Sequence, residues 1–385
     1  MSDLNVAIIG HRFMGKAHSH AWKDAPLFFD LPARPVMKVA CGRSIEPLRV
    51  FAQRWGWAEI DTDWRRVVER QDIDVVDISV PHNLHYEIAL AAARNGKHIF
   101  CEKPLALDFD QARQMYDAVR ESGITHYVNF NYRRCPAVAL AKQLIEEEKI
   151  GQIYHWRGAY MNSGLVDPTR PLKWTMLKEA AGSGPQASLN SHSVDLARYL
   201  VGEIRSVTAM ATNFITERPL NDVEAQRKAG KRGKVTVEDA IFMIAEFVNG
   251  ALGSFETTRF ATGRRNYNYF EIYGSKGSLA FNLERLNELE YFSREEPEYT
   301  QGFKTILVTQ QDHPYLSAWW PPGHIIGYEH TFIHAVTDFI NAVASGNGIE
   351  PDFYDGMKGM QVLDAGLASA KKGVRIVLDS PDRPG

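Results

Sequence analysis

Short apolar segments alternate with amphipathic ones along the first 130 residues, and this alternation constrains the fold more than any other feature. Strands are predicted over residues 6–9, 36–41, 75–80, 98–101 and 127–130. Helices are predicted between them over residues 47–55, 63–70, 85–94 and 108–121. Strands separated by helices in this way form parallel sheets with helices on both faces. Residues 1–130 are therefore predicted to form an α/β domain with a doubly wound Rossmann sheet.

The pattern changes after residue 131. A helix is predicted over 137–149, and long strand-like segments follow at 153–161, 207–215, 238–248, 251–260, 267–273 and 278–282. Asn249-Gly250 between two of them is a strong hairpin signal. Residues 131–385 are predicted to form an α+β domain with a mostly antiparallel open sheet. Residues 221–234 are expected to be an exposed loop, and helices over 328–344 and 356–371 are expected near the domain junction.

Composition limits the classes of partner. The chain has 385 residues and a net charge of −3, which argues against nucleic acid or an anionic membrane as a partner. Its three cysteines lack metal-type spacing and are expected to be reduced thiols. The N-terminus lacks a basic segment followed by a long apolar one, and no stretch reaches about 18 apolar residues. A cytoplasmic location without a membrane partner is expected.

A glycine-containing turn follows the first strand. The dinucleotide-binding fingerprint has glycines at the first, third and sixth positions, and here Gly10 and Gly15 occupy the first and sixth. Arg12 occupies the third position, where glycine normally lets the backbone approach the pyrophosphate. Phe13 and Met14 complete the turn. These residues are predicted to bind a nicotinamide dinucleotide.

The end of the second predicted strand bears on the choice between NAD and NADP. An acidic residue there would bind the ribose hydroxyls and repel a 2′-phosphate. The chain instead has Arg43 and Ser44, which could bind that phosphate by an ion pair and a hydrogen bond. NADP is slightly favoured over NAD. The alternative is that Arg43 is an ordinary solvated arginine beside a turn serine, without a role in binding the cofactor.

The segment Cys101 to Leu107 places a lysine at a strand end. Pro104 restricts Lys103 to extended geometry, so the lysine leaves the sheet at the carboxyl edge, where open α/β sheets bind ligands. Glu102 and Lys103 are therefore predicted to lie at the reactive end of the cofactor. The same edge should contain a second group of cofactor-binding residues, which follows the third strand: Val80, Pro81, His82, Asn83 and His85. For His85, the sequence is equally compatible with a structural role at the beginning of the next helix.

Several segments together resemble the glucose-fructose oxidoreductase/inositol dehydrogenase (Gfo/Idh/MocA) family. They are the glycine turn, PHNLH at 81–85, CEKPLAL at 101–107, NFNYRR at 129–134, SHSVDL at 191–196 and IYGSKGSL at 272–279. The resemblance implies an NAD(P)-dependent oxidoreductase whose open sheet forms a homodimer or homotetramer. Segments 13–19, 130–142 and 319–332 are most similar to the levoglucosan dehydrogenase-like branch, whose members oxidise a secondary ring hydroxyl, often at C3.

The resemblance also implies the catalytic groups. His192 matches the family's histidine, whereas Ser188 stands where an aspartate is expected four residues earlier. A serine cannot stabilise an imidazolium by charge as a carboxylate does. The predicted mechanism transfers the hydroxyl proton to His192 while Lys103 binds the reacting oxygen. Alternatively, the two exchange roles and Lys103 is the base.

Further residues are predicted to bind a small-molecule sugar or glycoside. Besides Lys103, Ser188 and His192, they are Tyr132, Arg133, Asn162, Trp174 and His324. Ser163 and Gly164 replace bulkier residues of the branch, which favours a larger glycoside or an inositol as substrate.

Two other functions stay open beside the dehydrogenase. One is redox-assisted glycoside cleavage with a retained cofactor, and the other is a sugar-sensing regulator of the same fold. The pairs His18/His20 and His330/His334 are considered as metal ligands, but no metal site is predicted. The second pair has i, i+4 helical spacing and lacks the adjacent glutamate of a zinc protease motif and a nearby third ligand.

Overall fold

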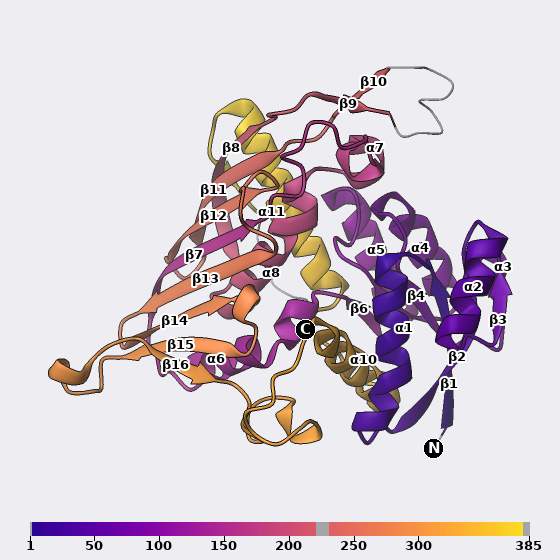
Figure 1. Cartoon of the computed structure of the whole chain (residues 1–385), viewed down its shortest axis with the longest axis horizontal. Helices are drawn as coiled ribbons and strands as arrows, with labels where there is room; N and C mark the ends of the chain where they lie inside the picture. Colours follow the sequence, from indigo (N-terminus) through magenta and orange to yellow (C-terminus); the bar gives the residue numbers. More distant parts are fainter. Residues whose placement is uncertain (1, 221–230, 380–385) are drawn as a thin grey trace. The chain divides into compact units, whose positions relative to one another are not determined.

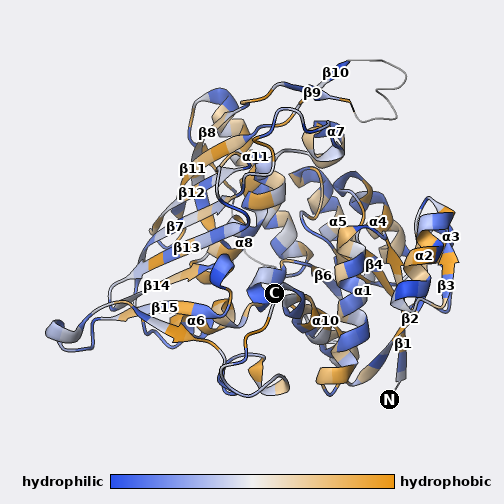
Figure 2. Ribbon diagram, viewed as in Figure 1, coloured by the Kyte–Doolittle hydropathy of each residue, from blue (hydrophilic) through white to orange (hydrophobic). Residues whose placement is uncertain are grey.

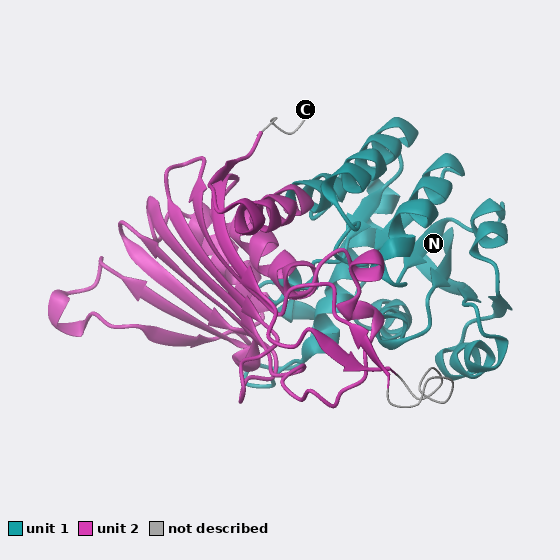
Figure 3. Ribbon diagram, turned by 90° about the horizontal axis from the view of Figure 1, so that it is seen from above, with its two compact units in different colours: residues 1–135, 314–358 teal, residues 136–313, 359–385 magenta. Residues whose placement is uncertain are grey.

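The computed structural model describes residues 2–220 and 231–379, which form two compact units (Figure 3). Unit 1 comprises Met1–Cys135 and Pro314–Lys358, and unit 2 comprises Pro136–His313 and Gly359–Gly385. The chain therefore leaves unit 1, forms most of unit 2, returns to unit 1 and ends in unit 2. The predicted domains, 1–130 and 131–385, stay a prediction.

Unit 1 contains a parallel sheet of six strands in the order β3-β2-β1-β4-β5-β6 (Figure 1). The strands are β1 (Ser2–Ile9), β2 (Ala33–Cys41), β3 (Glu59–Asp61), β4 (Val75–Ile78), β5 (His98–Cys101) and β6 (His126–Val128). The order reverses direction between β1 and β4, and open α/β sheets bind ligands at such a switch point. Val6, Ile8, Val75 and Ile78 are fully buried, as expected for central strands covered on both faces.

The helices of unit 1 begin and end where local signals place them. They are α1 (Phe13–Phe28), α2 (Ile45–Trp55), α3 (Trp64–Glu69), α4 (His85–Arg94), α5 (Phe109–Ser122) and α10 (Tyr328–Ser345), with short 3-10 helices η1 (His82–Leu84), η2 (Asn131–Arg134) and η7 (Leu316–Ala318). Asp108 caps α5, because its carboxylate accepts the N–H of Gln111 at 2.9 Å. Gly123 ends α5 with a φ of 65°, a conformation that favours glycine.

Unit 2 contains a nine-stranded sheet in the order β16-β15-β14-β13-β7-β12-β11-β8-β17. The strands are β7 (Ile153–Met161), β8 (Ile204–Thr212), β11 (Ala240–Phe247), β12 (Leu252–Thr258), β13 (Tyr267–Gly274), β14 (Gly277–Asn282), β15 (Glu288–Ser293), β16 (Lys304–Leu307) and β17 (Ile376–Val377). β7 and β12 pair in parallel, and the other neighbours pair antiparallel. A separate ribbon pairs β9 (Glu217–Pro219) with β10 (Arg232–Lys234).

The remaining helical segments of unit 2 are α6 (Pro136–Glu146), η3 (Trp174–Met176), α7 (Lys178–Ala181), η4 (Gln186–Asn190), α8 (Ser191–Leu200), η5 (Leu283–Arg285) and η6 (Glu298–Thr300). Helix α11 (Phe353–Lys372) begins in unit 1 and ends in unit 2. Helices α6 and α8 lie on one face of the nine-stranded sheet (Figure 1). Buried residues alternate with more exposed ones along β11 and β13, and the strands of this sheet contain both hydrophobic and hydrophilic residues (Figure 2).

The predicted fold class is confirmed: unit 1 is a parallel Rossmann sheet, and the sheet of unit 2 is mostly antiparallel. Several boundaries differ. The strand predicted over 75–80 ends at Ile78, and the strand predicted over 127–130 is His126–Val128. The helix predicted to begin at residue 356 begins at Phe353. Of the loop predicted over 221–234, Arg232–Lys234 forms β10, while 221–230 lie outside the described residues.

Candidate active site

The glycine turn between β1 and α1 contains two contacts that leave no room for a side chain. Gly10 has a φ of 120°, and a Cβ there would lie 2.3 Å from the backbone oxygen of Ser79. A Cβ on Gly15 would lie 2.3 Å from the backbone oxygen of Gly10. Arg12 precedes α1 with a φ of −86°, and its side chain is exposed. The turn therefore requires glycine at its first and last positions, whereas its third position accepts arginine.

The other residues of this turn are more open. Phe13 is 67% exposed and stacks on Tyr328, with ring centroids 6.4 Å apart, while Met14 is partly buried. Arg43 and Ser44 follow β2 and are both exposed. Ser44 precedes α2, but its hydroxyl makes no capping hydrogen bond. These side chains are free to reach a ligand beside the turn, and their cofactor-binding role stays a prediction.

His85 connects two parts of the carboxyl edge of the sheet. Its Nε2 lies 3.0 Å from the carbonyl oxygen of Val80, and its Nδ1 lies 3.0 Å from that of Pro104. Burial lowers the pKa of His85, and a neutral imidazole has one N–H to donate. His85 therefore donates to one of these carbonyls at a time. Pro81, His82 and Asn83 lie in the same turn, where His82–Leu84 forms η1.

Lys103 follows β5 and is partly buried. Its backbone N–H donates to Oε2 of Glu102 at 3.1 Å. The other carboxylate oxygen of Glu102 accepts from Nδ2 of Asn129 at 2.7 Å and lies 2.9 Å from Nε2 of His18. Glu102 is only 4% exposed. Its side chain therefore fixes the backbone from which Lys103 projects.

His18 lies between two buried carboxylates. Its Nδ1 is 2.8 Å from Oδ1 of Asp77, opposite the contact with Glu102, and Trp22 donates to Oδ2 of Asp77 at 2.7 Å. Burial alone lowers the pKa of His18, but the charges and hydrogen bonds of Asp77 and Glu102 together outweigh burial and raise it to about 10. His18 is therefore an imidazolium at neutral pH that donates to both carboxylates.

Two predicted substrate-binding residues lie in η2 of the same unit. Tyr132 is 4% exposed, and its ring centroid is 6.5 Å from that of Tyr328. Arg133 is 2% exposed, and its guanidinium lies 3.3 Å from Oδ1 of Asp355. The burial and ion pair of Arg133 give it a structural partner within unit 1. A substrate-binding role for either residue stays a prediction.

The histidines weighed as metal ligands have other partners. His334 accepts from Nε1 of Trp319 at 2.8 Å and donates from Nδ1 to the carbonyl of Arg134 at 2.9 Å; burial lowers its pKa to about 3. His330 accepts the N–H of Gly327, and His20 lies 2.8 Å from Asp24. Among residues 2–220 and 231–379, no group of three or more His, Cys, Asp and Glu side chains is arranged to hold a metal ion.

His192 and Ser188 belong to unit 2. His192 is 4% exposed at the beginning of α8, and its ring centroid is 5.9 Å from that of Tyr160 on β7. Ser188 lies in η4, a π-helical turn that directly precedes α8. The hydroxyl of Tyr160 donates to Asn266 at 2.7 Å, which fixes this ring beside His192.

Arg259 supplies the charged partner of Ser188. Its guanidinium donates to Oγ of Ser188 at 2.5 Å, to the carbonyl of Gly184 at 3.1 Å and to the carbonyl of Thr175 at 3.1 Å. Ser188 donates in turn to the carbonyl of Gly184 at 3.0 Å. Burial lowers the pKa of Arg259 to about 10, so it is still a cation at neutral pH. A buried cation thus contacts the position where the family pattern has an aspartate.

Three further residues predicted to bind the sugar lie in loops or in a short 3-10 helix. In unit 2, Asn162 accepts the N–H of Gly164 at 2.9 Å, and Trp174 is 40% exposed in η3. In unit 1, His324 is exposed, and its Nδ1 lies 2.8 Å from the carbonyl oxygen of Pro321. Their roles in binding a sugar stay predictions.

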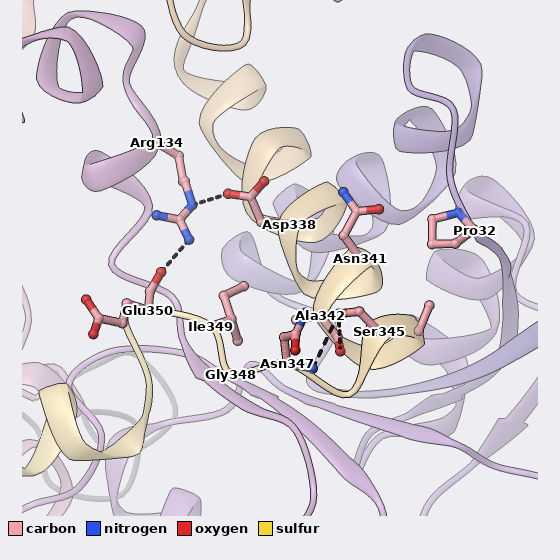
Figure 4. A pocket seen from close by; sticks show the side chains of 11 residues that line it. Pro32, Arg134, Asp338, Asn341, Ala342, Ser345, Asn347, Gly348, Ile349 and Glu350 are labelled. Carbon is pink, nitrogen blue, oxygen red and sulfur yellow. Dashed lines mark hydrogen bonds and ion pairs between the residues drawn. The ribbon is translucent and has the colours of Figure 1, made fainter. Parts of the chain in front are cut away.

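A cavity of about 670 Å³ in unit 1 lies at the C-terminal end of α10 (Figure 4). Arg134 forms part of its wall, pairing with Asp338 at 2.7 Å and donating to the carbonyl of Glu350. The rest of the wall is formed by Pro32 and by residues between Asn341 and Ile349. None of the predicted site residues lines this cavity. It is therefore separate from the chemistry predicted for Lys103 and His192.

Sequence reasoning missed the residues that support the proposed catalytic groups. His18 was weighed only as a metal ligand, and Asp77 and Arg259 were not considered. An acidic residue inside the apolar segment Val75–Ile78 is the one local signal that a buried charge needs a partner. Nothing local identifies that partner, because His18 and Asp77 are 59 residues apart in the chain.

Comparisons with known proteins bear on the family to which the chain belongs. Residues 4–130 match the oxidoreductase family with an NAD-binding Rossmann fold, and residues 138–280 match the GFO/IDH/MocA C-terminal domain. Levoglucosan dehydrogenase of Pseudarthrobacter phenanthrenivorans is 45% identical over 380 residues, which cover 97% of each chain. The chain belongs to the Gfo/Idh/MocA family. The predicted family membership is thereby confirmed.

Solved structures of this family have the same fold. A levoglucosan dehydrogenase in complex with NADH and levoglucosan has a TM-score of 0.94 at 44% identity, covering 98% of this chain and 100% of that one. An NAD-binding oxidoreductase from Klebsiella pneumoniae has a TM-score of 0.93 at 32% identity, covering 99% of this chain and 100% of that one. The preference for NADP is not supported, because complexes of levoglucosan dehydrogenase contain NADH. Among the described residues, no helix has the length and apolar composition needed to span a bilayer.

Proposed function

We propose that this NAD-dependent sugar dehydrogenase oxidises a secondary hydroxyl at C3 of a pyranose, glycoside or cyclitol ring. The observation that carries the proposal is Lys103, held after β5 by the buried carboxylate of Glu102 in a chain 45% identical to levoglucosan dehydrogenase. A lysine at the carboxyl edge of a Rossmann sheet is suited to bind the reacting oxygen of a ligand. The Ser163 and Gly164 pair further favours a glycoside or inositol larger than levoglucosan.

The residues of the glycine turn fit a dinucleotide. The contacts at Gly10 and Gly15 keep the turn close to β4, and α1 begins directly after it, where the first backbone N–H groups of a helix attract phosphate. We propose NAD as the cofactor, supported by the NADH complexes of levoglucosan dehydrogenase. Arg43 and Ser44 are exposed and would contact the adenosine ribose from outside the turn. Bound NAD supplies the nicotinamide ring that accepts a hydride.

In the proposed mechanism, His192 removes the hydroxyl proton, and Lys103 stabilises the negative charge that develops on the oxygen. Tyr160 and Asn266 hold the surroundings of His192, while Arg259 and Ser188 provide no negative charge near the imidazole. Ser188 offers no carboxylate that would stabilise an imidazolium, and we propose that neutral His192 accepts the proton. Alternatively, the two groups exchange roles, and Lys103 is the base. Tyr132, Arg133, Asn162, Trp174 and His324 are proposed to contact the rest of the sugar.

The open sheet of unit 2 supports a homodimer or homotetramer. Met210, Phe242, Ile244 and Leu252 are 79%, 47%, 63% and 61% exposed. Strand register pairs Met210 with Phe242 on one face of β8 and β11. An apolar patch of this kind marks an interaction surface. Light scattering of the wild type and of Ile244→Glu tests the proposal, and a monomeric wild type would contradict it.

The experiment is a cofactor-reduction screen at 340 nm with NAD and NADP against levoglucosan, alkyl glucosides, free hexoses and inositols. Turnover of one sugar class with NAD is expected. The substrate is then labelled with deuterium at C3, and transfer of the label to the reduced cofactor identifies the oxidised carbon. Label retained in the sugar would reject C3. Glycoside hydrolysis without net cofactor reduction would replace the proposal with redox-assisted cleavage.

A negative result also discriminates between functions. Cofactor binding measured by nucleotide fluorescence, without turnover of any sugar and without hydrolysis, would favour a regulator. The control in each case is the Lys103→Ala variant, which should bind NADH as the wild type does and should not turn over.

A further inference from the structure

A group of buried polar residues lies directly beneath Lys103. We define this His18 cluster as His18, Asp77, Glu102 and Asn129. The first three are 0%, 0% and 4% exposed, and Asn129 is 1% exposed. Its members come from α1, β4 and the ends of β5 and β6. The Rossmann fold binds its cofactor with the turn before α1. The ring of His18 on α1 instead lies between the carboxylates of Asp77 and Glu102.

We propose that His18 is a positioning residue for Lys103: it holds Glu102 in the orientation that fixes the lysine backbone, and its charge offsets that of the two carboxylates. The proposal deepens the proposed function, in which Lys103 contacts the reacting hydroxyl. The chain of contacts is direct. Nε2 of His18 is 2.9 Å from Oε1 of Glu102, and Oε2 of Glu102 is 3.1 Å from the backbone nitrogen of Lys103.

The charge count explains why an imidazolium is suited to this place. Asp77 and Glu102 contribute two negative charges, and His18 contributes one positive charge. The cluster therefore presents one net negative charge to the lysine ammonium. Without His18 the lysine would lie above two carboxylates, and each additional negative charge stabilises the ammonium form. His18 thereby limits how strongly the two carboxylates stabilise the ammonium form of Lys103.

Stability alone does not account for the cluster. A buried ion pair is often no more stable than apolar residues of the same volume, because desolvation of the charges opposes their attraction. The same unit also buries a histidine without charge. His334 is completely buried, accepts from Trp319 and donates to the carbonyl of Arg134. The fold thus accommodates neutral buried histidine, and the charged one lies next to the proposed catalytic lysine.

The groups around His18 leave the charge assignment unambiguous. Phe100 of β5 and Phe332 of α10 contact its ring with centroids 5.3 and 5.6 Å away, and Trp22 of α1 binds the far side of Asp77. Glu102 also interacts electrostatically with Cys101, Lys103, His85 and Tyr328. Of these, Lys103 is the only one that is charged at neutral pH.

The test measures the pKa of Lys103 directly, through the pH dependence of its acetylation rate followed by peptide mass spectrometry in the full-length protein. His18→Gln removes a positive charge and should raise the lysine pKa by about one pH unit. Glu102→Gln removes a negative charge while keeping nearly the same side-chain shape, and it should lower the lysine pKa by a similar amount. Asp77→Asn makes the same chemical change one contact further away and should lower it less. The exposed Lys16 of α1 is the internal reference and should be unchanged in every variant.

The opposite signs separate electrostatics from loosening of the structure. Loosening would move the lysine toward its ordinary pKa in all variants, so shifts of the same sign in His18→Gln and Glu102→Gln would overturn the proposal. The double variant His18→Gln/Asp77→Asn restores one net negative charge, and its lysine pKa should return toward that of the wild type. Circular dichroism and thermal melts verify folding. If His18→Gln does not fold, the test rests on Glu102→Gln and Asp77→Asn. The proposal would then be overturned if the lysine pKa shifted equally in these two variants or in neither.

Kinetics then distinguish this proposal from the proposed function. In the His18→Gln enzyme, the limb of the kcat pH profile that depends on Lys103 should shift in the same direction as the labelling pKa, while the KM for NAD stays the same. If labelling shifts as expected but Lys103→Ala retains full turnover, the proposed role of Lys103 fails and the charge arrangement stands. If kcat falls in His18→Gln with no shift in either profile, the positioning role is wrong.

Discussion

The two proposed catalytic groups have contrasting surroundings. Lys103 in unit 1 lies on the His18 cluster, in which an imidazolium pairs directly with two carboxylates. His192 in unit 2 lies beside Ser188, which binds the buried cation Arg259. The bonds of Arg259 go to neutral oxygens of Thr175, Gly184 and Ser188. The lysine therefore lies beside two carboxylates and one imidazolium, whereas Ser188 contacts a guanidinium with which Glu238 and Asp239 also interact electrostatically.

This contrast teaches how each group is adjusted to its role. A negative support keeps Lys103 an ammonium ion, which stabilises a developing alkoxide. Ser188 offers no carboxylate to stabilise an imidazolium, unlike the aspartate of the family pattern. Ser188 suits a position next to Arg259, because its hydroxyl accepts a hydrogen bond from the guanidinium and donates one to the carbonyl of Gly184. The missing aspartate is therefore a change of local charge rather than a simple loss.

Removal of the lysine should have the largest effect. Lys103→Ala should reduce kcat about 10³-fold, because it deletes the cation proposed to stabilise the alkoxide. Steady-state kinetics with NAD and the best sugar measure the loss, and nucleotide fluorescence verifies that NADH still binds. Lys103→Arg is the control that keeps the charge and changes its geometry. Full activity in Lys103→Ala would show that Lys103 is not a catalytic group.

The histidine variant should be affected less strongly. His192→Gln should reduce kcat about 10²-fold, the usual contribution of a general base, and should remove the acidic limb of the pH profile. The measurement is kcat from pH 5 to 10 in the wild type and the variant. A retained acidic limb would assign the base to Lys103 and exchange the two roles.

The His18 cluster should also make stability depend on pH. The pKa of His18 is about 10 in the folded protein, above its ordinary value of 6.5. The folded state thus holds a proton that the unfolded chain loses, so this stabilisation is complete below pH 6.5 and declines as pH rises toward 10. The unfolding free energy should fall by about 1 kcal/mol per pH unit in that window. Denaturant titrations at several pH values measure this slope, which should be absent in His18→Gln; an equal slope in both proteins would refute it.

The smallest effect is expected at the serine. Ser188→Asp introduces the carboxylate of the family pattern, but Arg259 is already 2.5 Å from this position and should pair with it. The pair is nearly neutral, so kcat/KM should stay within roughly threefold of the wild type. Ser188→Asn is the control of similar shape without charge. A tenfold gain in Ser188→Asp alone would mean that the missing carboxylate limits the enzyme and that Arg259 does not neutralise it.

Much of the fold follows from local sequence. The strand–helix alternation predicts the parallel sheet, Asp108 and Gly123 mark both ends of α5, and Asn249-Gly250 marks the turn between β11 and β12. Each signal depends on residues that are neighbours in the chain. No strand was predicted at β3, β9, β10, β15, β16 or β17. A strand of two to four residues has too few positions to show a period, but β15 was missed despite its six residues.

The sequence by itself also determined where Lys103 and His192 stand, because a proline after a strand and a family motif are both local patterns. Only the tertiary structure decided what surrounds them. Glu102 and His18 are 84 residues apart, and Arg259 and Ser188 are 71 apart. The physical reason is that burial makes a charge costly unless a partner reaches it, and which partner reaches it depends on the order in which strands lie in the sheet. The local sequence therefore predicts the proposed catalytic groups, and the fold decides which charged residues surround them.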